Sequence, residues 1–228
     1  YNMKLTPKFL SVKAVPTLFW SSPKALTIKP PLASVLFLIV GLTLFGLGEA
    51  LLVAAGVGVS PWTVLAQGIT QITGWSLGLA TFVTSFVVLF CWIPLRQMPG
   101  IGTILNAVII SLVLEFLLPF LPTFDHVMLK LGEAVLGVVV TGFGGGLYLI
   151  ANLGPGPRDG LMTGLQRVTD LPIAWVRSGL EVAVIAAGWA LGGTVGLGTV
   201  LFALGIGPSV AASMYALNSV FGQSKALA

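Results

Sequence analysis

Long apolar stretches alternate with short segments rich in glycine, proline or charge along most of the chain. Six stretches are long enough to cross about 30 Å of hydrocarbon as helices, and we expect them at residues 33–57, 76–95, 101–121, 131–153, 172–191 and 197–219. Two shorter segments, Pro61 to Thr73 and Pro157 to Thr169, each follow a glycine-rich break and begin with proline, which suits a helix start. Each would extend only about 20 Å as a helix, so neither spans a membrane alone. The pattern predicts an all-α polytopic membrane protein with six transmembrane helices and two short broken helices.

The composition supports this class and excludes several others. Hydrophobic residues make up 56% of the 228 residues and charged residues only 8%, whereas a soluble domain carries about 25% charged residues. The mean hydropathy is +1.03. The single cysteine, Cys91, leaves no intrachain disulfide, and the sequence offers no metal-ligand cluster, phosphate-binding loop or nucleophile–base set. We therefore expect no enzymatic activity, no cofactor and no metal site.

Basic residues indicate the orientation in the membrane. Five lysines precede the first span, so we expect residues 1–32 to form a basic tail that meets membrane lipid at the cytoplasmic face. With the N-terminus inside, ten of the eleven basic residues fall on the cytoplasmic side and only Lys130 falls outside. Residues 220–228 then form a cytoplasmic C-terminal tail. Because the charge lies in a tail next to a membrane span, the pI of about 9.5 does not indicate nucleic-acid binding.

The sequence also resembles itself at an offset of 96 residues, from position 46 to position 142. Eight glycine, proline, alanine and leucine residues of 46–68 recur without a gap in 142–164. The match resumes where Gly100, Gly102 and Thr103 recur as Gly196, Gly198 and Thr199. Residues 33–121 and 131–219 then form two repeats with three spans each. Since three is odd, the second repeat enters the membrane from the opposite side. Such a 3+3 inverted repeat is typical of secondary transporters, whose site lies at the repeat interface.

The two breaks are the predicted substrate site. Glycine and proline free backbone groups there, and such groups must be buried in protein or line a wet cavity. The short helix after each break directs its N-terminal amides toward that cavity, where they suit an anion or a carboxylate. Arg158 adds a fixed positive charge and Asp159 a carboxylate, although interfacial anchoring and helix capping are alternative roles for them. The candidate substrate-binding residues are Ser60, Pro61, Trp62, Thr63, Gly154, Gly156, Pro157, Arg158 and Asp159.

Ionisable residues within the spans are a second set of candidates, because leaving such a group in lipid costs several kcal/mol. Glu49 lies deep in the first span with no basic residue near it in sequence. We expect it either to meet Arg158 or Arg177 in space or to be protonated, and it is the candidate proton-coupling group. Arg177 and Glu181 have the i, i+4 spacing of a helical ion pair, with either a structural or a substrate-binding role.

The break Gly154-Pro155-Gly156-Pro157-Arg158-Asp159-Gly160 carries a family resemblance, together with Ser60-Pro61-Trp62 and the paired Gly-Ile-Gly-Thr and Gly-Leu-Gly-Thr. Over residues 33–220 the chain resembles the YczE-like integral membrane proteins of bacteria, which are similar to the YitT-type family. The resemblance implies a multi-pass protein of the bacterial inner membrane and no particular substrate. It also implies an acid after the first Pro-Trp, where this chain has Thr63.

Taken together, these features favour a small secondary transporter for a small anion or a carboxylate-bearing metabolite, with proton coupling as an option. A channel or facilitator with opposed short helices is one alternative. A membrane scaffold or accessory subunit that acts through a partner is another, and it would have a solid interior around Arg158. Small residues on helix faces can also pack closely between copies of the chain, so a homo-oligomer is a further option.

Overall fold

The computed structural model describes residues 15–222, and all of their regular elements are helices. In chain order they are α1 (Leu32–Ala55), α2 (Pro61–Thr73), α3 (Leu77–Phe90), α4 (Ile101–Leu117), the short 3₁₀ helix η2 (Leu118–Phe120), α5 (Val127–Ala151), α6 (Pro157–Thr169), α7 (Ile173–Ala190) and α8 (Leu197–Phe221). The predicted all-α fold is confirmed. Most of the two predicted tails, residues 1–14 and 223–228, lie outside the described residues.

Local signals in the sequence set most of the helix ends. The short helices α2 and α6 have the predicted bounds, each with proline in the first turn. The expected span 76–95 is wrong at its end, because α3 stops at Phe90. Pro94 explains the difference, since proline has no backbone N–H and its ring clashes with the carbonyl group four residues earlier.

Within residues 15–222, five helices are long and apolar enough to cross a membrane: α1, α4 with η2, α5, α7 and α8. The helices α2 and α3 meet at an angle of 114°, and as one bent pair they raise the number of candidate spans to six. The 14 residues of α3 extend only about 21 Å. Because α3 alone is shorter than the roughly 30 Å of hydrocarbon, the second predicted span needs the residues on either side of it to cross the membrane.

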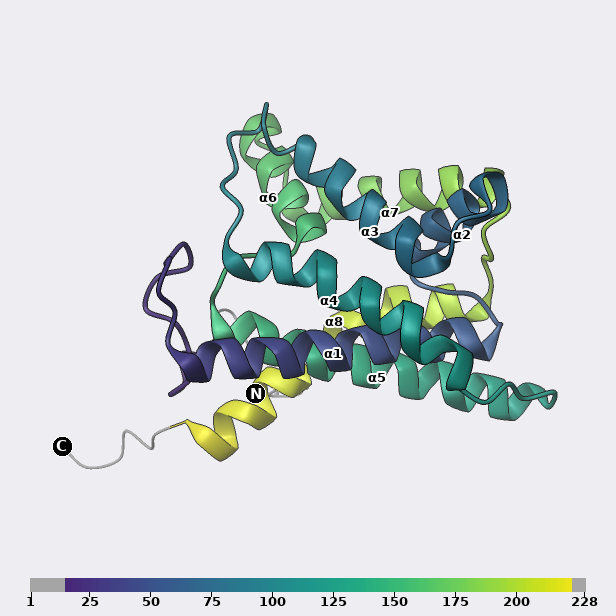
Figure 1. Ribbon diagram of the computed structural model, residues 1–228, viewed down its shortest axis with the longest axis horizontal. Helices are drawn as coiled ribbons and strands as arrows, with labels where there is room; N and C mark the ends of the chain where they lie inside the picture. The colour runs from purple at the N-terminus through teal and green to yellow at the C-terminus, as the bar shows by residue number, and fades with distance from the viewer. Residues whose placement is uncertain (1–14, 223–228) are drawn as a thin grey trace, which may run out of the picture.

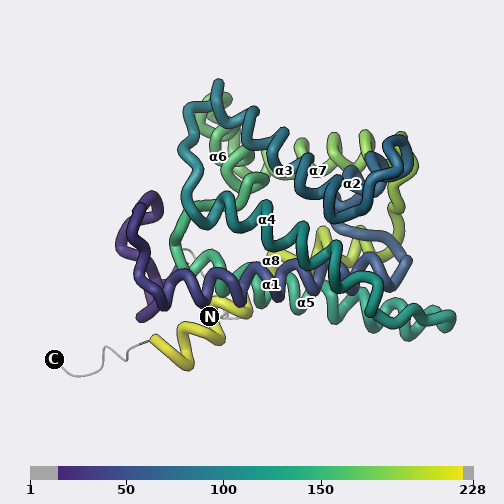
Figure 2. Tube along the Cα trace, in the orientation of Figure 1, coloured from purple at the N-terminus to yellow at the C-terminus, as the bar shows by residue number. Residues whose placement is uncertain are grey.

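The helices form two groups (Figure 1). In the first, α4, α1, α5 and α8 pack side by side in that order. In the second, α2 packs against α7, and α3 packs against α6. Figure 2 shows how the chain passes from one group to the other at the two breaks, after α1 and after α5. This exchange of segments places both breaks between the groups.

Glycines allow α1 and α5 to approach closely at the centre of the first group. A Cβ atom on Gly48 would lie 2.5 Å from the carbonyl oxygen of Gly137, and one on Gly144 would collide with the backbone of Gly41. Larger side chains at these positions would force the two helices apart. This close contact buries residues along most of α5, which also forms part of a cavity wall between the two groups of helices.

Each break is held by the start of the last helix of the other half. The backbone N–H of Gly102 donates to the carbonyl oxygen of Leu153 at 2.7 Å, and that of Gly198 donates to Val57 at 2.8 Å. At the offset of 96, Val57 and Gly102 correspond to Leu153 and Gly198, so the two bonds exchange partners between the halves. Two halves related by a two-fold axis would form this reciprocal pair of hydrogen bonds. The inverted repeat itself stays a prediction.

Gly58 provides a test of this arrangement. Its φ of +112° is strained for other residues, and an added Cβ atom would lie 2.6 Å from the backbone nitrogen of Gly196. Backbone strain alone costs roughly 1–3 kcal/mol, so we expect Gly58→Ala to lower the unfolding temperature in detergent by about 5 °C or more. Gly132→Ala is the matched control, because it meets nothing within 4 Å on α5. Equal unfolding temperatures for the two variants would contradict the proposed role of this contact.

Candidate functional site

Both breaks border one cavity of about 480 Å³ between the two groups of helices. The helices α1, α4, α5, α6, α7 and α8 and the start of α2 contribute to its lining. Eight of the residues singled out in the sequence line it: Ser60, Pro61, Trp62, Gly156, Arg158, Asp159, Arg177 and Glu181. Four other candidates do not line the cavity and lie behind the residues that do: Thr63, Gly154, Pro157 and Glu49.

Arg158 projects from the first turn of α6 and contacts the other break. Its guanidinium carbon lies 5.5 Å from the centroid of the Trp62 ring, within the range of a cation–π interaction. The only ion pair within 4.0 Å in the described part of the chain joins Arg177 and Glu181, so Arg158 has no carboxylate partner there. The half-buried guanidinium therefore keeps hydrogen-bonding capacity that faces the cavity.

Asp159 follows Arg158 in sequence but binds elsewhere. The hydroxyl of Tyr148, from α5, donates a hydrogen bond of 2.5 Å to its Oδ2. Gly156 holds the N-cap position of α6, so Asp159 does not cap the helix as one alternative supposed. The adjacent Arg158 and Asp159 thus present two separate, oppositely charged groups to one cavity.

Glu49 lies fully buried in α1, one side chain behind the cavity wall. Its Oε2 accepts hydrogen bonds from Ser60 Oγ at 2.6 Å and from Thr63 Oγ1 at 2.7 Å, and its Oε1 has no partner in the described residues. The sequence left two options for Glu49, a basic partner or protonation, and neither Arg158 nor Arg177 forms an ion pair with it within 4.0 Å. The two hydroxyl groups at the start of α2 satisfy this carboxyl group instead.

Arg177 and Glu181 lie on α7 and form the predicted i, i+4 pair. Arg177 Nε donates to Glu181 Oε1 at 2.9 Å, and the arginine side chain is 48% exposed. Because the two charges neutralise each other at the rim of the cavity, the pair contributes little net charge to the site.

The backbone of the second break is tied to neighbouring side chains. Trp92 Nε1 donates to the carbonyl oxygen of Pro157 at 2.9 Å, and Thr103 Oγ1 donates to that of Pro155 at 2.7 Å. Gly154 has a φ of +108°, which turns the chain into the break. These contacts fix the start of α6 and with it the position of Arg158.

Sequence reasoning missed two polar groups and the apolar wall of the cavity. Asn106 of α4 and Tyr148 of α5 both line it. Each is a polar side chain inside an apolar span, and that signal could have identified them. The apolar wall comes mainly from one face of α8, where every fourth residue lines the cavity: Phe202, Ile206, Val210 and Met214.

Comparison with known proteins places the chain in a family. A model described as a family of unknown function (DUF6198) matches residues 32–215. An uncharacterized protein of Haemophilus influenzae is 40% identical over 199 residues, which cover 87% of this chain and 90% of the relative. The uncharacterized membrane protein YczE of Bacillus subtilis is 34% identical over 177 residues, 74% of this chain and 79% of the relative. No solved structure matches. The chain therefore belongs to this family of YczE-like membrane proteins, whose function is unknown.

Proposed function

We propose that this protein is a small secondary transporter of the bacterial inner membrane, with the two breaks of a 3+3 inverted repeat framing its substrate site. The substrate is a carboxylate-bearing metabolite or a small anion. The observation that carries the proposal is the cavity of about 480 Å³ that both breaks border and that Arg158 enters without a carboxylate partner in the described residues.

The chemistry of Arg158 supports an anionic group on the substrate. A guanidinium partly withdrawn from bulk water is costly when no carboxylate lies within 4.0 Å of it, as for Arg158 among the described residues, so a carboxylate that enters the cavity recovers part of that cost. The planar guanidinium offers two parallel N–H groups to such a carboxylate. The N-terminus of α6, which begins at Pro157, adds partial positive charge on the same side.

A cavity at this position favours transport over a scaffold. The scaffold alternative requires a packed interior around Arg158, whereas this interior holds space of the size typical of small-molecule sites, about 300–1,000 Å³. A carrier and a facilitator differ in whether uptake depends on a proton gradient, and Glu49 is the group proposed to provide that dependence.

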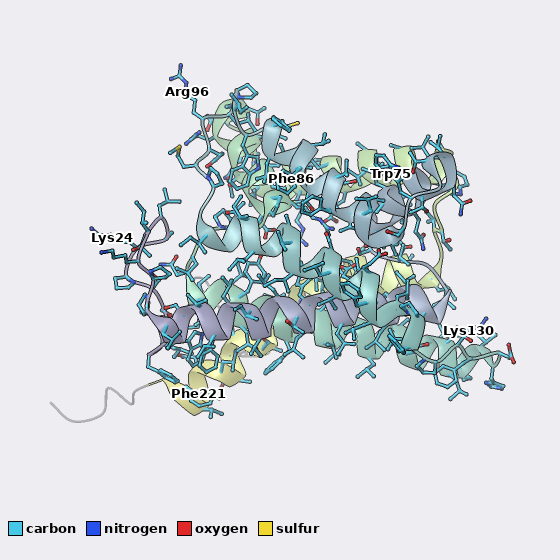
Figure 3. The ribbon with its side chains drawn as sticks, in the orientation of Figure 1. Lys24, Trp75, Phe86, Arg96, Lys130 and Phe221 are labelled. Atoms are coloured by element: carbon cyan, nitrogen blue, oxygen red, sulfur yellow. The ribbon has the colours of Figure 1, made fainter. Side chains whose placement is uncertain are left out.

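The placement of basic residues supports cytoplasmic termini. Lys24 and Arg96 lie at one end of the long axis of the molecule, and Lys130 lies at the opposite end (Figure 3). Because basic residues accumulate on the cytoplasmic side of membrane proteins, the end with Lys24 and Arg96 is proposed to face the cytoplasm.

Replacing Arg158 tests the substrate site directly. We expect Arg158→Ala to weaken binding of a carboxylate ligand at least about tenfold, which is 1.4 kcal/mol or more. The measurement is the ligand-dependent rise in unfolding temperature of the detergent-purified protein, screened with carboxylates, amino acids and inorganic anions. Lys130→Ala is the control at the far end of the molecule. If the folded Arg158→Ala protein keeps wild-type affinity, the anion site is wrong.

Replacing Glu49 tests proton coupling separately from folding. In Glu49→Gln the amide oxygen still accepts from Ser60 and Thr63, so we expect a folded protein whose uptake into proteoliposomes no longer depends on a pH gradient. Glu49→Leu removes the acceptor of Thr63, while Ser60 can still donate to Thr63 Oγ1 at 2.9 Å. One buried hydroxyl group without an acceptor costs roughly 1–3 kcal/mol, so we expect a lower unfolding temperature. A gradient dependence that persists unchanged in Glu49→Gln would remove this residue from the coupling mechanism.

A further inference from the structure

We infer that the cavity takes an amphipathic zwitterion, of the class of α-amino acids with bulky apolar side chains, in preference to a simple anion. The inference rests on the proposed transport function and specifies its substrate. It comes from three features of the cavity: two unpaired opposite charges, a lining without net charge, and a long apolar wall.

The two unpaired charges come from consecutive residues in the first turn of α6. Arg158 faces the ring of Trp62 at 5.5 Å, and Asp159 binds the neutral hydroxyl of Tyr148 at 2.5 Å. Neither has an oppositely charged partner within 4.0 Å among residues 15–222. A simple anion would gain the attraction of Arg158 and meet the repulsion of Asp159. A ligand with a carboxylate and an ammonium group on one carbon atom gains from both.

The lining as a whole points to a ligand without net charge. Its other two charged side chains, Arg177 and Glu181, pair with each other at 2.9 Å. The four charged groups of the lining therefore balance. Because the charged side chains of the lining balance, a ligand with both charges and no net charge complements them better than an anion does.

Asp159 retains the capacity to bind an ammonium group. An ionised carboxylate has about four acceptor positions on two oxygens, and the described structure uses one of them, on Oδ2, for Tyr148. The residue is exposed and lines the cavity. The hydroxyl of Tyr148 thus orients the carboxylate without neutralising it.

The apolar wall of the cavity indicates that the uncharged part of the ligand is a bulky apolar group. Phe202, Ile206 and Met214 of α8 line the cavity, and Phe45 of α1 joins them. An inorganic anion would fill a small part of the 480 Å³ and would leave this wall facing water. A bulky apolar side chain covers it and gains about 25 cal/mol for each Å² removed from water.

Two sets of three compounds test the inference on the full chain in detergent. The first set is phenylalanine, 3-phenylpropionate and 2-phenylethylamine; the second is leucine, 4-methylpentanoate and 3-methylbutylamine. Within each set the apolar body is kept and one charged group is removed. From the ligand-dependent rise in unfolding temperature, we expect at least one amino acid to bind about tenfold or more tightly than both of its singly charged analogues.

Variants separate this inference from the proposed function. Asp159→Asn keeps an acceptor for Tyr148, and we expect it to bind the amino acid and its carboxylate analogue about equally. Asp170→Asn is the matched control at the other end of α6, where the φ of +54° suits asparagine. If the carboxylates bind the wild-type protein as tightly as the amino acids do, the zwitterion is wrong and the carboxylate transporter stands. If neither these compounds nor the anion panel stabilises the folded wild-type protein, the inference and the proposed function are both overturned.

Discussion

The need to satisfy the backbone of two interrupted helices governs this structure. Inside a membrane, water does not complete the hydrogen bonds of an irregular segment, so the protein itself must do so. Here Gly102 donates to Leu153 and Gly198 donates to Val57, at 2.7 and 2.8 Å. Because each break is held by a helix of the other half, the two breaks come together and border one cavity. The hydrogen bonds that satisfy the backbone at the two breaks therefore also determine where the cavity lies.

The two breaks are similar in backbone and different in chemistry. The first gives the cavity an aromatic ring and a hydroxyl group, from Trp62 and Ser60, and the second gives it the charges of Arg158 and Asp159. Thr63, which corresponds to Asp159 at the offset of 96, turns away from the cavity and binds Glu49. The charged groups that face the cavity from the breaks therefore both come from α6. The buried carboxyl group of Glu49 on α1 lies behind the hydroxyl group of Ser60, which lines the cavity.

The packing around the site is uneven. Much of α5 is buried, and glycines seat it closely against α1, so the wall that carries Tyr148 is firmly supported. In contrast, α7 buries only Val176 and Gly188 among its 18 residues, although it carries the ion pair at the rim. The wall of the cavity is therefore firmly packed on the side of α5, whereas α7 packs mainly against α2.

The sequence by itself determined the membrane class, the helices and the breaks, because these depend on local properties. Apolar length set the spans, and proline and glycine set the bounds of α2 and α6. The spacing of Arg177 and Glu181 was enough to predict their pair. Pro94 ends α3 earlier than the apolar pattern alone predicts, at Phe90.

Only the tertiary structure decided which side chains meet. The sequence left a basic partner or protonation open for Glu49, and the chain path brings the hydroxyl groups of Ser60 and Thr63 to it. The contacts of Arg158 with Trp62 and of Asp159 with Tyr148 join residues from different helices, and no local pattern encodes such contacts. They depend on which helices become neighbours, and that choice follows from glycine contacts and backbone hydrogen bonds between distant segments. The predicted breaks located the site, and the packing of the helices assigned its chemistry.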